Sequence, residues 1–382
     1  MKPTVLIVYQ YFYPGYNAGG PVQSLINMIE TLNQQFNFAV FTSAYDLNET
    51  IPYSNIQLNE WNNMKINNQT IPVWYASAKV GKQKFLSIVK QIQPQYIFLN
   101  GMYGRTFFLT PLLLKSQFKK LNVQVVVSPR GMLQKGALAV KPFKKKIYFE
   151  LLKTFNVTKN ILWHATNADE AEDIKKMFGS NCNITIAANI PKQPFIAIKP
   201  IYKEENTLSL VYLSIITPKK NLLLLLEILK ECRTKISLDI YGPIKEKQYW
   251  DLCNESIKQL PENISVIYKG NVQPKNVQQT FAEYNASILL TQGENFGHAL
   301  FESLSVGTPI ITSNYTNWNQ LEKNNAGWNV DIKNKKYIRA LIEILSEKNN
   351  KIWQPYNNGA HQYATNYFYK QKFVEVYQQL FS

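Results

Sequence analysis

Short apolar runs alternate with segments of helical periodicity along the first half of the chain. Apolar runs bounded by turn residues predict strands, and apolar residues spaced three or four positions apart predict helices. The expected strands cover residues 5–9, 38–42, 96–99, 123–128 and 161–165. The expected helices cover residues 21–33, 82–92, 106–118 and 169–177. This alternation favours an α/β domain built on one parallel sheet.

The same alternation starts again at residue 208 and predicts a second α/β domain. The expected strands are 208–213, 236–241, 264–268, 286–290 and 309–312, and the expected helices are 298–306, 335–346 and 361–381. A chain of 382 residues is too long for one ordinary core, which also favours about two domains. We expect the boundary near residues 191–200, where Pro191, Pro194 and Pro200 predict a stiff linker.

Residues 286–318 are the stretch most typical of a ligand site. They read as strand, acidic loop, helix, the glycine stop Gly307, and a further strand. In open α/β sheets, ligands bind at the carboxyl ends of strands, where the next helix presents unpaired N–H groups. Asn295, Phe296 and Gly297 fall at this position, and Gly297 permits a close backbone approach to an anion.

Two glutamates flank this position. Glu294 lies in the loop, and Glu302 lies about one helical turn inside the following helix, eight residues away. Carboxylates accept charge-assisted hydrogen bonds from the hydroxyl groups of sugars and ribose. The alternative for Glu302 is a solvated helix residue with no ligand.

The stretch GENFGHALFESLSVGTPIITSN, residues 293–314, resembles the acidic signature of the GT-B glycosyltransferases. It is similar in particular to retaining family 4, the glycosyl transferases group 1, whose pattern is a glutamate, seven residues and a second glutamate. The resemblance implies that Glu294 lies against the donor sugar, as a catalytic residue, and that Glu302 holds the nucleotide ribose. It also implies that five backbone amides face the donor diphosphate, those of Asn295, Phe296, Gly297, His298 and Ala299.

A second resembling segment, LSIITPKKNLLLLLEIL, opens the second domain. In the family, an arginine and a lysine of this segment together neutralise the donor diphosphate. Lys220 matches the lysine, whereas Ile215 stands in the place of the arginine. We expect the missing cation to weaken donor binding or leaving-group stabilisation unless Lys219 or Arg130 replaces it.

The first domain supplies two further candidates. Gly19 and Gly20 precede Pro21, an arrangement that favours an anion-binding turn, although turn glycines can be purely structural. In the resembled family, a glycine pair here lies over the donor phosphate and the acceptor. Arg130 follows the strand 123–128 and can clamp a phosphate, at a position where many family members carry a histidine near the reacting sugar. We predict a catalytic role for Arg130.

The resemblance implies a GT-B fold, with two Rossmann-like doubly wound domains facing a central cleft and a C-terminal helix crossing back. The expected domains are an acceptor-side domain, residues 1–192, a nucleotide-sugar domain, residues 201–360, and a helix, residues 361–382, packing on the first domain. The implied function is metal-independent, retaining transfer of a sugar from a nucleoside diphosphate to a glycan or lipid-linked acceptor. No D-x-D motif is present, so we expect neither a metal nor a cofactor besides the donor itself.

The charge balance adds a candidate partner. The chain carries 42 Lys and Arg against 26 Asp and Glu, a net charge of +16, which suits nucleic acid, an anionic membrane surface or an acidic substrate. Lys141, Lys144, Lys145 and Lys146 lie among apolar residues in KPFKKKIYFELLKTF, a pattern typical of an interfacial helix. A solvated helix with a lysine-rich face is the alternative. No nucleic-acid reader motif or zinc spacing is present, so we expect no nucleic-acid partner.

The sequence also gives expectations for the cellular location of the protein and for its role. The apolar run at residues 5–9 is too short for a secretory signal, and no run approaches the roughly 20 apolar residues of a membrane span. We therefore expect a cytoplasmic protein, with the inner face of the plasma membrane as a candidate location and bacterial surface polysaccharide synthesis as its role. The alternatives are a catalytically silent partner subunit, as Ile215 allows, a nucleotide-sugar epimerase of the same fold, and a basic nucleic-acid-binding protein.

Overall fold

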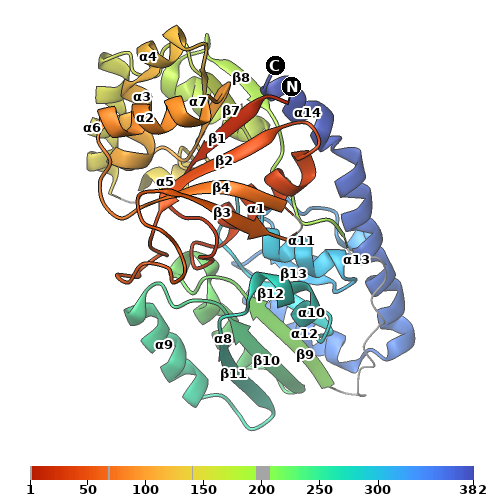
Figure 1. Ribbon diagram of the computed structural model, residues 1–382. Helices are drawn as coiled ribbons and strands as arrows, with labels where there is room; N and C mark the ends of the chain where they lie inside the picture. Colours follow the sequence, from red (N-terminus) through yellow and green to blue (C-terminus); the bar gives the residue numbers. More distant parts are fainter. Residues whose placement is uncertain (1, 68, 140, 195–206) are drawn as a thin grey trace. The chain divides into compact units, whose positions relative to one another are not determined.

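The computed structural model describes residues 2–67, 69–139, 141–194 and 207–382, which fall into two compact units (Figure 1). One unit consists of Met1–Ile190 and Lys372–Ser382, and the other of Pro191–Gln371. The stiff linker expected at residues 191–200 lies outside the described residues from residue 195 onward.

The first unit is built on an eight-stranded sheet in the order β3-β4-β2-β1-β5-β6-β7-β8. Its strands are β1 (Thr4–Val8), β2 (Asn37–Ser43), β3 (Trp61–Ile66), β4 (Gln69–Ala76), β5 (Tyr96–Asn100), β6 (Gln124–Ser128), β7 (Leu162–Ala165) and β8 (Asn183–Ile186). Neighbouring strands are parallel, except that β3 runs antiparallel to β4. The expectation of one parallel sheet is therefore wrong at this edge. Because most of β3 is at least partly exposed, its sequence lacks the apolar pattern that marks a buried strand.

Helices cover both faces of this sheet. They are α1 (Gly20–Leu32), α2 (Lys82–Ile92), α3 (Thr110–Leu113), α4 (Lys115–Lys120), α5 (Lys135–Ala139), α6 (Pro142–Thr154), α7 (Ala168–Phe178) and α14 (Phe373–Leu380). On one face, Phe85 and Phe118 share a buried cluster with Leu6. On the other face, Phe381 packs against Phe98 with ring centroids 6.0 Å apart. The single helix expected at residues 106–118 is instead a π-helical turn, Arg105–Leu109, followed by α3 and α4.

The second unit is built on a fully parallel six-stranded sheet in the order β11-β10-β9-β12-β13-β14. Its strands are β9 (Thr207–Leu213), β10 (Lys235–Tyr241), β11 (Ile264–Gly270), β12 (Ala286–Leu289), β13 (Ile310–Ser313) and β14 (Gly327–Val330). In order along the chain this is 3-2-1-4-5-6, the doubly wound Rossmann arrangement that the sequence predicts. The order reverses between β9 and β12, so ligand binding is expected where these strands end.

The helices of the second unit also lie on both faces of the sheet. They are α8 (Leu222–Leu229), α9 (Lys247–Lys258), α10 (Val277–Phe281), α11 (His298–Ser305), α12 (Lys335–Glu347) and α13 (Asn350–Lys370). Leu210 and Tyr212 of β9 pack in one cluster with α8 and α12, whereas Val211 packs with Phe281 and Val306 in another. The single final helix expected at residues 361–381 is wrong in its limits. α13 begins earlier, at Asn350, and a break separates it from α14.

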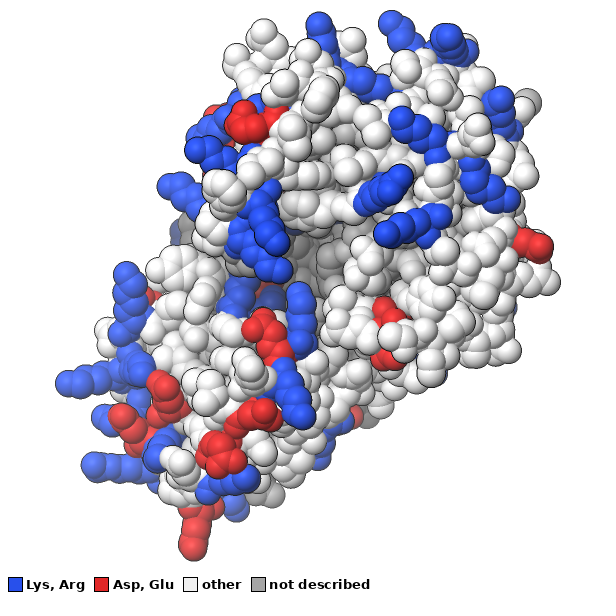
Figure 2. Space-filling view, turned by 90° about the vertical axis from the view of Figure 1, so that its left-hand side faces the viewer, with Lys and Arg blue, Asp and Glu red and all other residues white. Residues whose placement is uncertain are grey.

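The lysine-rich stretch forms the expected helix, α6, but one of its lysines faces inward. The Lys145 ammonium donates a hydrogen bond to the carbonyl of Ala137 and lies 5.6 Å from the centroid of the Tyr103 ring. Lys141, Lys144 and Lys146 are exposed. Lysines and arginines are spread over the face of the first unit that carries α6 (Figure 2). The basic surface expected from four lysines is therefore formed by three.

One glycine fixes the loop that follows β9. Gly242 comes directly after β10, at φ +134°, and a Cβ atom there would lie 1.9 Å from the carbonyl oxygen of Ser214. The ends of β9 and β10 can approach this closely only if residue 242 has no side chain.

We predict that Gly242→Ala lowers the free energy of unfolding by about 3 kcal/mol, because it combines a backbone clash with an unfavourable φ. Gly270→Ala is the matched control, since Gly270 also has a positive φ, +76°, but has open space where a Cβ would lie. The control is expected to cost about 1 kcal/mol. Chemical denaturation followed by circular dichroism measures both, and equal costs would contradict the clash.

Candidate functional site

The loops that follow β9 and β12 leave the second sheet at the same edge. β12 pairs with β9 in parallel, with Ala286 opposite Leu210 and Ser287 opposite Val211. Because parallel neighbours end at the same edge, residues 214–221 and 290–297 come together although about 70 positions separate them along the chain.

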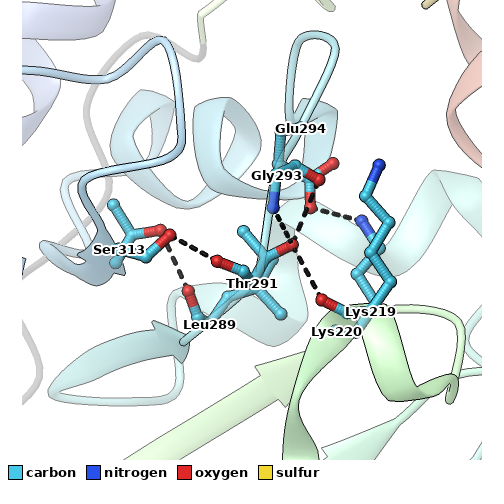
Figure 3. Close-up of polar contacts among 8 residues, drawn as sticks. Lys219, Lys220, Leu289, Thr291, Gly293, Glu294 and Ser313 are labelled. Atoms are coloured by element: carbon cyan, nitrogen blue, oxygen red, sulfur yellow. Dashed lines mark hydrogen bonds and ion pairs between the residues drawn. The ribbon is translucent and has the colours of Figure 1, made fainter. Parts of the chain in front are cut away.

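Lys220 and Glu294 form an ion pair between these two loops (Figure 3). The side chain of Lys220 is 20% exposed and that of Glu294 is 10% exposed. Shielding from water makes their attraction stronger than that of a surface pair, and leaves either charge poorly solvated when its partner is removed. The structure thus brings together two residues that the sequence singles out.

Hydrogen bonds hold the backbone of both loops in place (Figure 3). The carbonyl of Lys219 accepts hydrogen bonds from the amide of Gln292 at 2.9 Å and from Oγ1 of Thr291 at 3.3 Å. The amide of Glu294 donates to the carbonyl of Tyr315 at 3.2 Å. The backbone of the loop that carries Glu294 is therefore held in place by the protein itself.

Lys219 supplies a second cation at this site. A Cβ atom on Gly293 would lie 3.7 Å from Cε of Lys219, which places this side chain along the loop that carries Glu294. Burial lowers the pKa of the Lys219 ammonium, and the nearby Glu294 carboxylate opposes this change. Within the part of the chain that the structure describes, the Lys219 ammonium makes no hydrogen bond or ion pair. Ile215, in the same loop, contributes no charge.

The acidic loop leads into the N-terminus of α11. Gly297 adopts φ +82°, and a Cβ atom there would lie 3.1 Å from Nε1 of Trp318. The Phe296 side chain is buried against Trp318, with ring centroids 5.1 Å apart. Phe296 therefore anchors the loop, and its side chain is not available to a ligand. The first-turn amides of α11 and the positive end of its dipole face the end of this loop.

Glu302 lies in α11 and is 5% exposed, so it is not the solvated helix residue that the sequence left open. Burial raises the pKa of Glu302 to about 7, and the positive charge of Lys192 opposes the rise. Among the described residues, its carboxylate has no hydrogen-bond donor. An acid that is buried without a donor can accept hydrogen bonds from ligand hydroxyl groups.

Arg130 is a partly buried hub at the carboxyl end of β6. Its Nε donates to Oδ1 of Asn100 at 2.5 Å, and its Nη1 donates to Oγ of Ser24 at 3.3 Å and to Oδ1 of Asn189. The guanidinium also lies 5.7 Å from the centroid of the Phe98 ring. These contacts join α1, β5 and the segment after β8, so Arg130 has a clear structural role. Its catalytic role stays a prediction.

Sequence reasoning missed the acid beside this hub. Glu170 is buried and accepts hydrogen bonds from the amide of Gly131 at 2.5 Å and from the amide and hydroxyl of Thr166, both at 2.7 Å. The sequence shows Glu170 only as an acid in the first turn of a helix. Nearby, His164 bonds to Ser128 and Ala187, and burial with the charge of Arg130 lowers its pKa to about 3. His164 is therefore a neutral core residue.

The glycine pair lies where the sequence predicts it. Gly19 is the residue before α1, with φ +70°, and Gly20 is the first residue of that helix. Pro21 follows within the first turn, as expected. The amide of Gly19 donates to the carbonyl of Tyr16 at 2.9 Å. The pair therefore forms the turn between β1 and α1.

Among the described residues, no group of three or more His, Cys, Asp or Glu side chains converges into a set that could hold a metal ion. No helix in this part of the chain combines the length and the apolar character that crossing a bilayer requires.

Comparison with solved structures gives the fold. The UDP-glucose complex of Anabaena HepE superposes with a TM-score of 0.70 and 15% sequence identity, over 99% of this chain and 98% of that one. Sucrose-phosphate synthase of Thermosynechococcus elongatus gives a TM-score of 0.71 at 12% identity, over 100% and 99% of the two chains. A variant of S. aureus TarM, in complex with fondaparinux, α-GlcNAc-glycerol and UDP, gives 0.69 at 13% identity over 100% of both chains.

Sequence comparison gives the family. No curated protein matches the chain. Residues 195–362 match the family model described as glycosyl transferases group 1, and this match includes Lys219, Lys220, Glu294 and Glu302. The chain therefore has the GT-B fold, and its residues 195–362 are similar to the glycosyl transferases group 1 family.

Proposed function

We propose that this protein is a retaining, metal-independent glycosyltransferase, which moves a sugar from a nucleoside diphosphate to a hydroxyl group of a glycan or lipid-linked acceptor. The observation that carries the proposal is the pairing of Lys220 with Glu294, beside Lys219 and at the N-terminus of α11. This arrangement combines cations for a diphosphate with a carboxylate for a sugar.

The donor diphosphate fits the positive groups of this site. Two ammonium groups, those of Lys219 and Lys220, and the first-turn amides of α11 can share the charge of the two phosphates. Charge grows on the leaving nucleotide as the bond to the sugar breaks, so groups fixed in advance stabilise the transition state. Lys219 would then replace the cation that Ile215 does not supply.

The two glutamates would hold the two ends of the donor. A phosphate that binds Lys220 competes with Glu294 for the ammonium, which leaves the Glu294 carboxylate able to accept hydrogen bonds from the sugar. Glu302 would accept hydrogen bonds from the ribose hydroxyl groups. The departing phosphate would help to activate the acceptor hydroxyl on the same face of the sugar, as the resemblance to the family implies, which retains the anomeric configuration.

The structural neighbours favour particular substrates. HepE is complexed with UDP-glucose and TarM with UDP, which supports a uridine diphosphate sugar as the donor. WaaG, another similar structure at 11% identity and a TM-score of 0.65, is a glycosyltransferase involved in lipopolysaccharide biosynthesis. The similarity to WaaG supports a role in bacterial surface polysaccharide synthesis. We propose in addition that the protein works in the cytoplasm, at the inner face of the plasma membrane.

One observation favours a second candidate, a catalytically silent partner subunit. Ile215 stands in place of one of the two cations of the family site. The protein can therefore be an enzyme only if Lys219 supplies the missing positive charge. Turnover of a nucleotide sugar by the purified protein separates the two candidates, and interconversion of the free nucleotide sugar would instead indicate an epimerase.

We predict that Glu294→Gln lowers sugar transfer from the donor by at least about a hundredfold while the protein stays folded, because the amide keeps the shape and removes the charge. Product formation measured by mass spectrometry checks this, with circular dichroism for the fold. Glu255→Gln is the matched control, since Glu255 forms an exposed ion pair with Lys258 at 2.7 Å. Wild-type turnover by Glu294→Gln would refute the assignment.

We predict that Lys219→Gln lowers kcat/KM for the donor by about tenfold or more, because one of the two cations facing the diphosphate is lost. Lys258→Gln, on the surface of the same unit, is expected to have no effect. Adding Ile215→Arg to Lys219→Gln is expected to restore part of the loss, since it returns a cation to the same loop. Unchanged kinetics in Lys219→Gln would show that Lys219 does not act for the missing arginine.

We predict opposite pH effects of Glu302 on stability and on nucleotide binding. Burial raises the pKa of Glu302 from 4.5 to about 7, so the folded protein holds this proton more tightly than the unfolded chain does. The resulting stabilisation is complete below pH 4.5 and is lost as the pH rises to about 7. Without ligand, Glu302→Gln is therefore expected to be more stable than the wild type at pH 8, by up to about 3 kcal/mol, and much less so at pH 5.5.

Nucleotide binding is expected to show the reverse trend, because the ionised carboxylate is the better acceptor for ribose hydroxyl groups. Wild-type affinity for a nucleoside diphosphate should rise as the pH increases through about 7, and that of Glu302→Gln should not. Thermal unfolding and calorimetric titration across this range measure the two effects. An affinity that Glu302→Gln leaves unchanged at pH 8 would reject the ribose contact.

A further inference from the structure

The outward face of α6 carries a row of exposed apolar side chains. Phe143, Ile147, Leu151 and Phe155 recur every four residues and are 74%, 46%, 50% and 72% exposed. Side chains four positions apart lie on the same side of a helix, so these four form one stripe. Phe149 points the other way, into the core. Single exposed apolar residues are ordinary, but a continuous stripe indicates an interaction surface.

Cations lie at both ends of this stripe. Lys141, Lys144 and Lys146 are exposed at the start of α6. At the other end, the Lys115 ammonium donates to the carbonyls of Asn156 at 2.7 Å and Lys159 at 2.9 Å, which ties α4 to the segment that follows α6. Lys159 of this segment is exposed, as are Lys119 and Lys120 of α4.

The surrounding sequence is almost free of acids. Between Glu60 and Asp169, the one acidic residue is Glu150, and Lys153 pairs with it at 2.9 Å. This stretch includes α2 to α6, so Glu150 is the one acid among the basic residues of these helices. Figure 2 shows the result on the first unit, where lysines and arginines stand among uncharged residues with few acids between them.

We propose that the α6 stripe, Phe143, Ile147, Leu151 and Phe155 with Lys141, Lys144 and Lys146, docks this protein on an anionic lipid bilayer. The apolar side chains enter the boundary between headgroups and acyl chains, and the lysines contact the anionic headgroups. A nucleic acid would match the lysines but would leave the four apolar side chains in water. The inference goes beyond sugar transfer, because it concerns a surface of the first unit that the donor site does not use.

Binding of the full chain to vesicles tests the surface without any need for turnover. Co-sedimentation compares vesicles of phosphatidylcholine with vesicles that also contain phosphatidylglycerol, at low and high salt. We expect binding to the anionic vesicles, weakened by salt because screening shortens the reach of the lysines, but not abolished, because apolar insertion remains.

Two variants separate the contribution of the apolar side chains to vesicle binding from that of the lysines. Phe143→Gln with Phe155→Gln, and Lys141→Gln with Lys144→Gln and Lys146→Gln, are each expected to weaken apparent vesicle affinity by about tenfold or more. The matched controls lie in the second unit and are expected to bind like the wild type. They are Leu252→Gln with Ile344→Gln, which are 58% and 53% exposed, and Lys247→Gln with Lys258→Gln and Lys275→Gln.

Failure of the membrane proposal can be told apart from failure of the proposed sugar transfer. All variants should retain wild-type hydrolysis of a nucleotide sugar in the absence of vesicles, because none of the substituted residues belongs to the donor site. Equal binding to neutral and anionic vesicles, or wild-type binding by both α6 variants, would overturn the proposal. Binding to duplex DNA or RNA that requires the lysines and not the phenylalanines, without vesicle binding, would also overturn it and indicate a nucleic-acid surface.

Discussion

The ion pair between Lys220 and Glu294 depends on one constraint, the parallel pairing of β9 with β12. That pairing brings two loops to the same edge of the sheet, and each loop contributes one charge. The two groups are largely shielded from water, so removing either leaves an unbalanced charge in the protein. The pair therefore keeps a cation and a carboxylate in position until a ligand of complementary charge exchanges with one of them.

Arg130 of the first unit and Lys219 of the second differ in how many hydrogen bonds they already make within the protein. Arg130 already donates to Asn100, Ser24 and Asn189, so a phosphate there would compete with three acceptors of the protein. Lys219 makes no such bond within the described residues, and its ammonium stands beside the loop of Glu294. A cation without protein acceptors loses less when it binds an anion. This contrast favours Lys219 over Arg130 as the replacement for the cation missing at Ile215.

Much of this architecture could be predicted from the sequence, because buried strands and their turns leave a strong apolar pattern. The strands β9 to β13 and the loop before α11 follow from that pattern, and the spacing of Glu294 and Glu302 predicts a site there. The edge strand β3 could not be predicted, because an exposed strand has no apolar periodicity. The inward turn of Lys145 and the burial of Glu170 depend on tertiary packing, which a local pattern does not encode.

The burial of Glu302 shows how far the site departs from what stability alone would favour. Among the described residues the Glu302 carboxylate has no hydrogen-bond donor, so its ionised form destabilises the folded state, and burial raises its pKa for the same reason. A glutamine or an apolar residue would remove that cost, so the acid is explained better by a ligand that supplies the missing donors. Functional sites often break the rules of stable packing in this way, because a group that binds a ligand is retained although it lowers the stability of the fold. Hydroxyl groups, which donate without adding charge, are the ligand groups that this environment suits.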